Sequence, residues 1–230
     1  MFTYIPDLLS AEESDRLMAL LGKAGFADGA LTAGWNAKLV KKNEQLDRSG
    51  AGYGEVEPLV RAALTRNATF AMAVRPRLMR PILFNRYVEG MSYGPHVDDP
   101  LMGYADAATS GQPPIRTDVA FTLFLADPGA YDGGELVVNH SGGEQRFKFP
   151  AGGLIAYPAC YLHRVEPVTR GARLAAFGWV QSEVRDPSRR EILFEIDTVR
   201  RTLFQREGKS AMFDQLSKSF ANLLRMWAES

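Results

Sequence analysis

The sequence is poor in the features that mark secreted, membrane-bound and phosphate-binding proteins. It contains one cysteine, Cys160, so no disulfide can form within the chain and no oxidising compartment is indicated. No segment reaches the ~18 consecutive apolar residues of a membrane span, and no basic stretch followed by an apolar run opens the chain. Lys+Arg and Asp+Glu both number 27, so no chain-wide basic field exists to bind nucleic acid or anionic lipid. We therefore expect a cytoplasmic protein without a nucleic-acid or membrane partner.

Three regions of different pattern follow one another along the 230 residues. A capping box at Ser10 and Glu13, followed by apolar residues at helical spacing, predicts helices within 1–79. From 80 to 180, short apolar runs are interrupted by Gly and Pro about every ten residues, which is typical of a sandwich or barrel of strands. The region 186–230 returns to the helical period after a cap at Asp186. We expect a mostly β core with helices packed on it and a C-terminal helical extension.

The boundaries within the β region follow from local patterns. Gly-rich turns are expected at 132–134 and 141–143, and a hairpin turn at 167–171. The expected strands are 82–88, 119–125, 135–139, 145–149, 153–156 and 172–180.

The chain has only three histidines, and two of them can share a metal ion with a carboxylate. His96 and Asp98 are two residues apart, so in extended backbone their side chains point to the same face. His163 follows the apolar run 154–162. Two imidazoles and one carboxylate form the ligand set of non-haem Fe(II) oxygenases, which leaves positions open for a cosubstrate and O₂. Taken alone, the spacing also arises by chance. Cys160 would face away from His163, and we expect it to be a small core residue.

Arg173 adds a positive charge to this set. A turn at 167–171 would place Arg173 on a strand adjacent to that of His163, near a diagonal position roughly 7–8 Å away. A dicarboxylate that chelates a metal through one end could be held at its other end by the two-pronged hydrogen bonds of a guanidinium. A structural arginine would instead extend its head group to solvent.

Several segments together resemble a known enzyme family. They are 84–87 (FNRY), 93–98 (YGPHVD), 133–136 (GGEL), 163–165 (HRV) and 170–173 (RGAR). These segments resemble the prolyl 4-hydroxylase branch of the Fe(II)/2-oxoglutarate dioxygenases. The whole chain is similar to bacterial PKHD-type hydroxylases, a group with PiuC-like members linked to iron uptake. The resemblance implies a double-stranded β-helix, or jelly roll, for the core.

The same resemblance implies a role for each matching residue. His96, Asp98 and His163 would bind Fe(II), and Arg173 would bind the far carboxylate of 2-oxoglutarate with Tyr87 as a hydroxyl donor beside it. The enzyme would hydroxylate a C–H bond of a small-molecule or peptide substrate, using O₂ and releasing succinate and CO₂. Ascorbate would serve as the reductant that restores Fe(II). The carboxylate of Asp98 disfavours a halogenase, because halogenating relatives lack it.

Two other functions are compatible with parts of the sequence. Residues 90–94 match the G-x-S-x-G nucleophile elbow of serine hydrolases, with Ser92 as the nucleophile, but Gly94 and Pro95 follow where that motif requires a helix. A jelly roll with the same ligand types could also hold zinc as a non-enzymatic metal-binding or sensor protein. Arg173 favours the dioxygenase over the metal-binding or sensor protein, because a site that binds only a metal does not need a residue to bind an anion.

Two further segments have predicted roles. The segment 100–116 has little periodicity and is long enough to form a functional loop beside the metal. The C-terminal helices carry an apolar stripe that includes Leu216, Phe220, Leu223 and Trp227. We expect this stripe to pack on the β core or on a second copy of the chain, because an exposed stripe of that size is an aggregation hazard.

Overall fold

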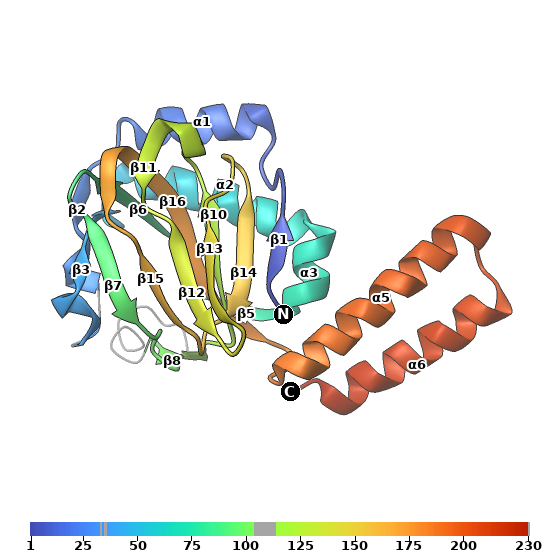
Figure 1. The fold of residues 1–230 in the computed structure, drawn as a ribbon. Helices are drawn as coiled ribbons and strands as arrows, with labels where there is room; N and C mark the ends of the chain where they lie inside the picture. The colour runs from blue at the N-terminus through green and yellow to red at the C-terminus, as the bar shows by residue number, and fades with distance from the viewer. Residues whose placement is uncertain (33, 35, 104–113, 230) are drawn as a thin grey trace.

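Two antiparallel sheets face each other (Figure 1). The cavity described below lies between them. The computed structural model describes residues 1–32, 34, 36–103 and 114–229. The larger sheet has the order β1 (Thr3–Ile5), β14 (Leu154–Pro158), β10 (Val119–Phe124), β16 (Val168–Ser182), β6 (Leu83–Val88), β4 (Glu44–Leu46) and β2 (Phe26–Asp28). β11 (Tyr131–Gly133) and β5 (Pro76–Met79) also pair with β16. The smaller sheet has the order β13 (Gly143–Phe147), β12 (Leu136–His140), β15 (Leu162–Val165), β7 (Ser92–His96) and β3 (Lys41–Lys42).

Because side chains alternate between the two faces of a strand, one face of the larger sheet packs in the apolar core and the other lines the cavity. Every residue of β10 is buried, because one face of the strand meets the helices and the other meets the cavity. Leu123 belongs to the apolar core on the helix side, whereas Thr122 lines the cavity. A short ribbon of β8 (Leu101–Met102) and β9 (Ile115–Arg116) lies outside the two sheets.

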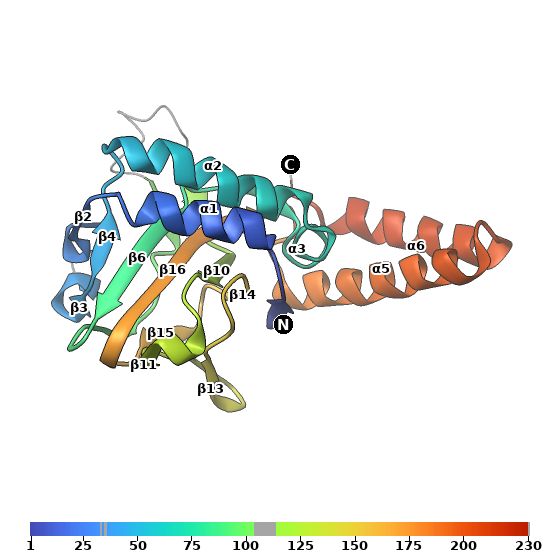
Figure 2. The ribbon, with the colours of Figure 1, turned by 90° about the horizontal axis from the view of Figure 1, so that it is seen from above.

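Three helices cover the outer face of the larger sheet (Figure 2). They are α1 (Ala11–Leu21), α2 (Ala51–Arg66) and α3 (Ala68–Val74), and the short 3₁₀ turns are η1 (Gly29–Thr32), η2 (Ala37–Leu39) and η3 (Pro128–Ala130). The expected capping box is present at the start of α1, where the Ser10 side chain accepts from the Glu13 backbone and Glu13 accepts from the Ser10 backbone. Leu17 of α1 and Val56 of α2 are fully buried against the sheet.

The C-terminal helices form a hairpin that projects away from the sheets (Figures 1 and 2). α5 (Pro187–Glu207) and α6 (Ala211–Trp227) pack against each other, and Gly208 between them adopts a positive φ of 68°. At the base of the hairpin, Phe220 and Leu193 are buried against Val184, with Leu223 and Trp227 around them. Much of the expected apolar stripe therefore packs within the hairpin and at its base.

The structure confirms the mostly β core with flanking helices and the C-terminal helical extension. The expected hairpin turn at 167–171 is wrong, since β16 already begins at Val168 and pairs with β11 through this stretch. Cys160 is exposed in the turn between β14 and β15, so its expected place in the core is also wrong. Residues 104–113 of the expected loop 100–116 lie outside the described residues.

Candidate active site

A cavity of about 230 Å³ lies between the two sheets and receives side chains from both. Alternate residues of β16 line its wall on the larger sheet: Arg173, Phe177 and Trp179. Leu136 and Val165 contribute apolar surface from the smaller sheet. The cavity is thus a mixed apolar and polar pocket, as is usual for sites that bind small molecules.

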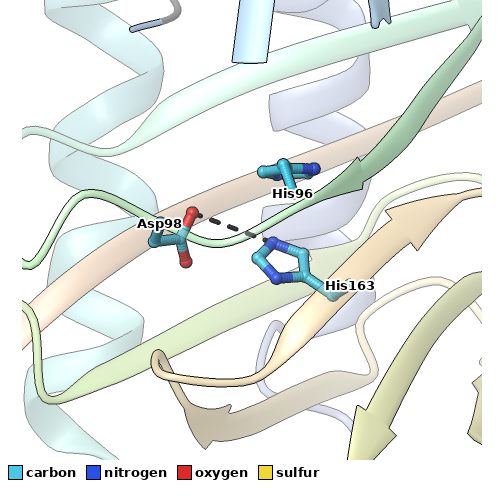
Figure 3. Close-up of side chains that lie close together, drawn as sticks. All are labelled: His96, Asp98 and His163. Carbon is cyan, nitrogen blue, oxygen red and sulfur yellow. Dashed lines mark ion pairs between the residues drawn. The ribbon is translucent and has the colours of Figure 1, made fainter. Parts of the chain in front are cut away.

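His96, Asp98 and His163 meet at the smaller sheet. His163 of β15 is directly opposite His96 of β7 in the strand register, and the two ring centroids are 4.2 Å apart. Asp98 follows the end of β7, and its Oδ1 lies 3.8 Å from Nε2 of His163 (Figure 3). One ligand atom from each of the three residues lies within 4.8 Å of the others. These dimensions allow the three side chains to share one cation.

Backbone carbonyls orient both imidazoles. The Nδ1 of His96 lies 2.9 Å from the carbonyl oxygen of Gly94, and the Nδ1 of His163 lies 3.0 Å from that of Tyr161. Because a carbonyl only accepts, Nδ1 carries the proton in each ring and Nε2 keeps a free lone pair. Burial, together with the nearby His163, lowers the pKa of His96 to about 3, so its imidazole is neutral at physiological pH. Tyr93 stacks on the His96 ring at a centroid distance of 3.6 Å.

One oxygen of the buried Asp98 carboxylate lacks a hydrogen-bond partner among the described residues. Its Oδ2 is buried and makes no hydrogen bond to any residue that the structure describes. Burial raises the pKa of Asp98 above its ordinary value. A divalent cation between Asp98 and the two imidazoles would supply the missing partner, and the donor set of two nitrogens and one oxygen suits Fe(II). The residues present therefore fit an iron centre.

Arg173 is a buried cation on the larger sheet. It is 1% exposed, and its guanidinium lies 5.3 Å from the ring centroid of Tyr87 and 5.5 Å from that of Phe124. Its Nη1 donates to Oδ1 of Asn85 at 3.3 Å, while Nε has no hydrogen-bond partner within the described part of the chain. A buried charge without a counterion is costly, so this environment favours binding of an anion.

The structure places Arg173 differently from the expected diagonal beside His163. β15, which carries His163, pairs with β12 and β7, whereas β16, which carries Arg173, pairs with β6 and β10 in the opposite sheet. The expected neighbourhood within one sheet is therefore wrong. Arg173 and His163 nevertheless line the same cavity from opposite sides.

Tyr87 is directly opposite Arg173 in the register of β6 and β16, and it is buried. Burial raises the pKa of Tyr87 to about 12, against the opposing effect of the Arg173 charge. Its hydroxyl group therefore keeps its proton at physiological pH and can donate a hydrogen bond into the cavity.

Gly134 allows the chain to pass close to the aliphatic part of Arg173. Its φ is +68°, and a Cβ atom built there would lie 3.1 Å from Cδ of Arg173 and 3.0 Å from Cε2 of Tyr131. We expect Gly134→Ala to lower the free energy of unfolding by about 1–3 kcal/mol and to weaken anion binding at Arg173. Urea unfolding and ligand titration check this, with Gly129→Ala as the control because nothing lies within 4 Å of its added methyl group. Equal effects of the two substitutions would contradict the explanation.

Sequence reasoning did not select several polar residues that line the cavity. They are Lys41, Asn43, Asn85, Thr122, Tyr157 and Trp179. Asn85 had a detectable signal, because it is two residues before Tyr87 on an expected strand and thus shares its face. No sequence signal pointed to Lys41 or Asn43, since the sequence did not predict strands in that region.

Comparison with known proteins identifies the family. Residues 82–181 match the 2OG-Fe(II) oxygenase superfamily, and residues 188–229 match the PKHD-type hydroxylase C-terminal domain. The chain is 53% identical over 229 residues to a PKHD-type hydroxylase of Synechococcus sp. (strain JA-2-3B'a(2-13)), covering 100% of both proteins. The chain belongs to the PKHD-type hydroxylases. A PKHD-type hydroxylase of Synechococcus elongatus is 49% identical over the same length and coverage.

Solved structures share the fold of this PKHD-type hydroxylase. A 2OG-Fe(II) oxygenase family oxidoreductase from Burkholderia pseudomallei has a TM-score of 0.54 at 20% identity, covering 77% of this chain and 84% of that one. A prolyl hydroxylase from Trichoplax adhaerens, in complex with a hypoxia inducible factor peptide fragment, has a TM-score of 0.52 at 14% identity, with coverages of 78% and 83%. The core is the jelly roll of the 2OG-Fe(II) oxygenases.

Family membership decides between the functions that the sequence left open. PKHD-type hydroxylases are 2OG-Fe(II) oxygenases, and the family implies Fe(II) and 2-oxoglutarate as cofactor and cosubstrate. The chain is therefore an enzyme rather than a metal-binding sensor. Ser92 begins strand β7 instead of preceding a helix, so the context of a hydrolase nucleophile is missing. Within the described residues, no helix has the length and apolar character needed to cross a membrane.

Proposed function

We propose that the chain hydroxylates a C–H bond of its substrate with iron held by His96, Asp98 and His163. The observation that supports this most strongly is the buried, unpartnered Oδ2 of Asp98 beside two imidazoles oriented with Nε2 free. When bound, the iron would supply the O₂ chemistry that couples substrate hydroxylation to conversion of 2-oxoglutarate into succinate and CO₂. The three side chains hold only one side of the metal and leave the remaining positions to ligands from the cavity.

The larger sheet would hold the other end of 2-oxoglutarate. Arg173 would pair with the distal carboxylate through its guanidinium, and Tyr87 would donate its hydroxyl proton to the same group. The apolar walls of Leu136, Val165 and Phe177 would exclude water between the two ends. The chain's contribution is thus position and electrostatics.

Slow consumption of 2-oxoglutarate in the absence of any substrate tests this function. We expect the protein with Fe(II) and O₂ to form succinate, and we expect a chelator to stop the reaction. A protein that only stores or senses metal would form no succinate.

A second experiment searches for the substrate. Incubation of a cell extract with the protein, Fe(II), 2-oxoglutarate and O₂, followed by mass spectrometry, would reveal a small-molecule or peptide substrate as a gain of one oxygen atom. Ascorbate is included as the proposed reductant; the cytoplasmic location and the link to iron uptake stay predictions.

We also propose that the C-terminal hairpin contacts a second copy of the chain. Val199 and Phe204 of α5 are 59% and 50% exposed, whereas the apolar residues at the base of the hairpin are covered. Sedimentation velocity is expected to show a dimer, and Val199→Lys combined with Phe204→Lys is expected to give a monomer. Thr202→Lys combined with Gln205→Lys changes exposed polar positions of the same helix and serves as the control. A monomeric unmodified protein would contradict this proposal.

A further inference from the structure

Asn43 lies where the chain crosses from the smaller sheet to the larger one. It is the single residue between β3, which pairs with β7, and β4, which pairs with β6. In the antiparallel register, Gln45 is opposite Asn85 and Glu44 is opposite Arg86, so the next position places Asn43 opposite Tyr87. Figure 2 shows β4, β6 and β16 in sequence across the larger sheet.

Arg173 of β16, Tyr87 of β6 and Asn43, the residue before β4, therefore form one row across the larger sheet. Tyr87 is directly opposite Arg173 on the other side of β6. All three residues line the same cavity, as expected for residues in one row of a sheet, whose side chains share a face. The row begins at the buried cation and ends at the buried amide.

The Asn43 side chain is buried without a conventional hydrogen bond. It is 3% exposed, and neither Oδ1 nor Nδ2 makes a hydrogen bond of ordinary geometry to the residues that the structure describes, although the side chain lies close enough to Tyr87 to interact with its hydroxyl group. Its backbone is fixed by the Gly29 N–H, which donates to the Asn43 carbonyl at 2.9 Å. The amide also packs tightly on Gly29, where an added Cβ would lie 1.9 Å from Asn43 Oδ1. Buried amides are rarely left unpaired, so this one points to a role in the cavity.

We propose that Asn43 is a positioning residue that directs the Tyr87 hydroxyl toward the distal carboxylate of 2-oxoglutarate. A phenol has one proton, and a neighbouring group that accepts that proton removes it from the cosubstrate. An amide NH₂ that donates to the phenol oxygen leaves the proton for the carboxylate. This inference rests on the proposed function, in which Arg173 and Tyr87 bind that carboxylate.

The electrostatics of Tyr87 show that its hydroxyl group keeps its proton and interacts with Asn43. Burial dominates and raises the pKa of Tyr87, so its proton is retained. The interaction with the Asn43 side chain lowers that pKa to a smaller extent, as expected for two polar groups that lie beside each other. A chain of donation from Asn43 to Tyr87 to the ligand also polarises each hydrogen bond in the same direction.

Asn43→Asp tests the proposal because it replaces the donating NH₂ with an accepting oxygen of similar shape. We expect the Kd of 2-oxoglutarate, measured by calorimetry on the Fe(II)-loaded protein without O₂, to rise by about ten-fold to a hundred-fold. The KM for 2-oxoglutarate in uncoupled turnover should rise similarly, with kcat within about two-fold. Pyruvate has the same 2-oxo acid end but no distal carboxylate, so its Kd should not change.

Asn43→Leu is the second variant and removes the donor without adding a charge. In the wild-type background it should weaken 2-oxoglutarate binding, and in a Tyr87→Phe background it should have no further effect. Circular dichroism and thermal melting establish that each variant is folded. An effect of Asn43→Leu that persists without the Tyr87 hydroxyl would overturn the positioning role in favour of direct contact with the ligand. An equal loss of pyruvate binding would overturn it in favour of a structural role.

Arg173→Ala in the same titration separates this proposal from the proposed function. Weakened 2-oxoglutarate binding in Arg173→Ala but not in Asn43→Asp would refute only the role of Asn43. Unchanged binding in Arg173→Ala would refute the cosubstrate site itself.

Discussion

Replacement of His163 by alanine is expected to abolish tight Fe(II) binding and turnover. His96 and Asp98 would remain as ligands, and two ligands leave a cation poorly held. Asp98 would also lose the imidazole that lies 3.8 Å from its Oδ1, which leaves its buried carboxylate with fewer partners. The measurements are an anaerobic Fe(II) titration and the rate of succinate formation from 2-oxoglutarate. We expect at least a hundred-fold loss of affinity, the upper end of what supporting residues of a metal site already cost.

His140→Ala is the matched control for this experiment. His140 lies at the end of β12, where its Nδ1 accepts from the backbone N–H of Gly142, and it is not among the residues that line the cavity. The control should bind Fe(II) and form succinate as the unmodified protein does. If His163→Ala keeps both its iron affinity and its turnover, the proposed ligand set is wrong.

Substitution of Arg173 is expected to weaken 2-oxoglutarate binding while Fe(II) affinity barely changes. Arg173→Lys keeps the positive charge but loses the planar fork that pairs with a carboxylate. A charge-assisted hydrogen bond contributes roughly 1.5–3 kcal/mol, so we expect a ten-fold to hundred-fold weaker affinity. Arg173→Ala should be weaker still, because no cation then meets the carboxylate as it leaves water. Two titrations measure this: Fe(II) without cosubstrate, and 2-oxoglutarate with iron present.

Arg170→Ala provides the control on the same strand. Arg170 is exposed and pairs with Asp132, so its removal should leave both affinities unchanged. Unchanged 2-oxoglutarate affinity in Arg173→Ala would exclude Arg173 as the anchor. Simultaneous loss of both affinities would show that Arg173 supports the structure instead.

Local patterns in the sequence predicted the parts of the fold that depend on neighbouring residues. The capping box of Ser10 and Glu13 and the cap at Asp186 mark real helix starts, because a cap is satisfied within one turn of the chain. The His-x-Asp spacing similarly predicted that the His96 and Asp98 side chains lie close together, and the structure shows that they do. Such features are encoded almost entirely in short stretches of sequence.

The sequence could not predict which strands are neighbours. His163 and Arg173 are ten residues apart, and a tight hairpin between them would have placed them in one sheet. The chain instead crosses from the smaller sheet to the larger one at Glu166 and Pro167, between β15 and β16. Asn43 shows the same limit, since only strand pairing with residues more than 40 positions away brings it beside Tyr87. These arrangements depend on which apolar faces pack together over long separations.

Because the proposed ligand-binding residues are divided between the two sheets, the cavity can select a ligand by its length. His96 and His163 belong to the smaller sheet, and Arg173 and Tyr87 to the larger sheet. A dicarboxylate that reaches both ends ties the sheets together, so the spacing between the sheets selects the length of the cosubstrate. A shorter acid can contact the residues of only one sheet, and a longer acid must bend to fit between the two sheets. The same tie couples folding to ligation: metal and cosubstrate together should raise the unfolding temperature by more than the sum of their separate effects.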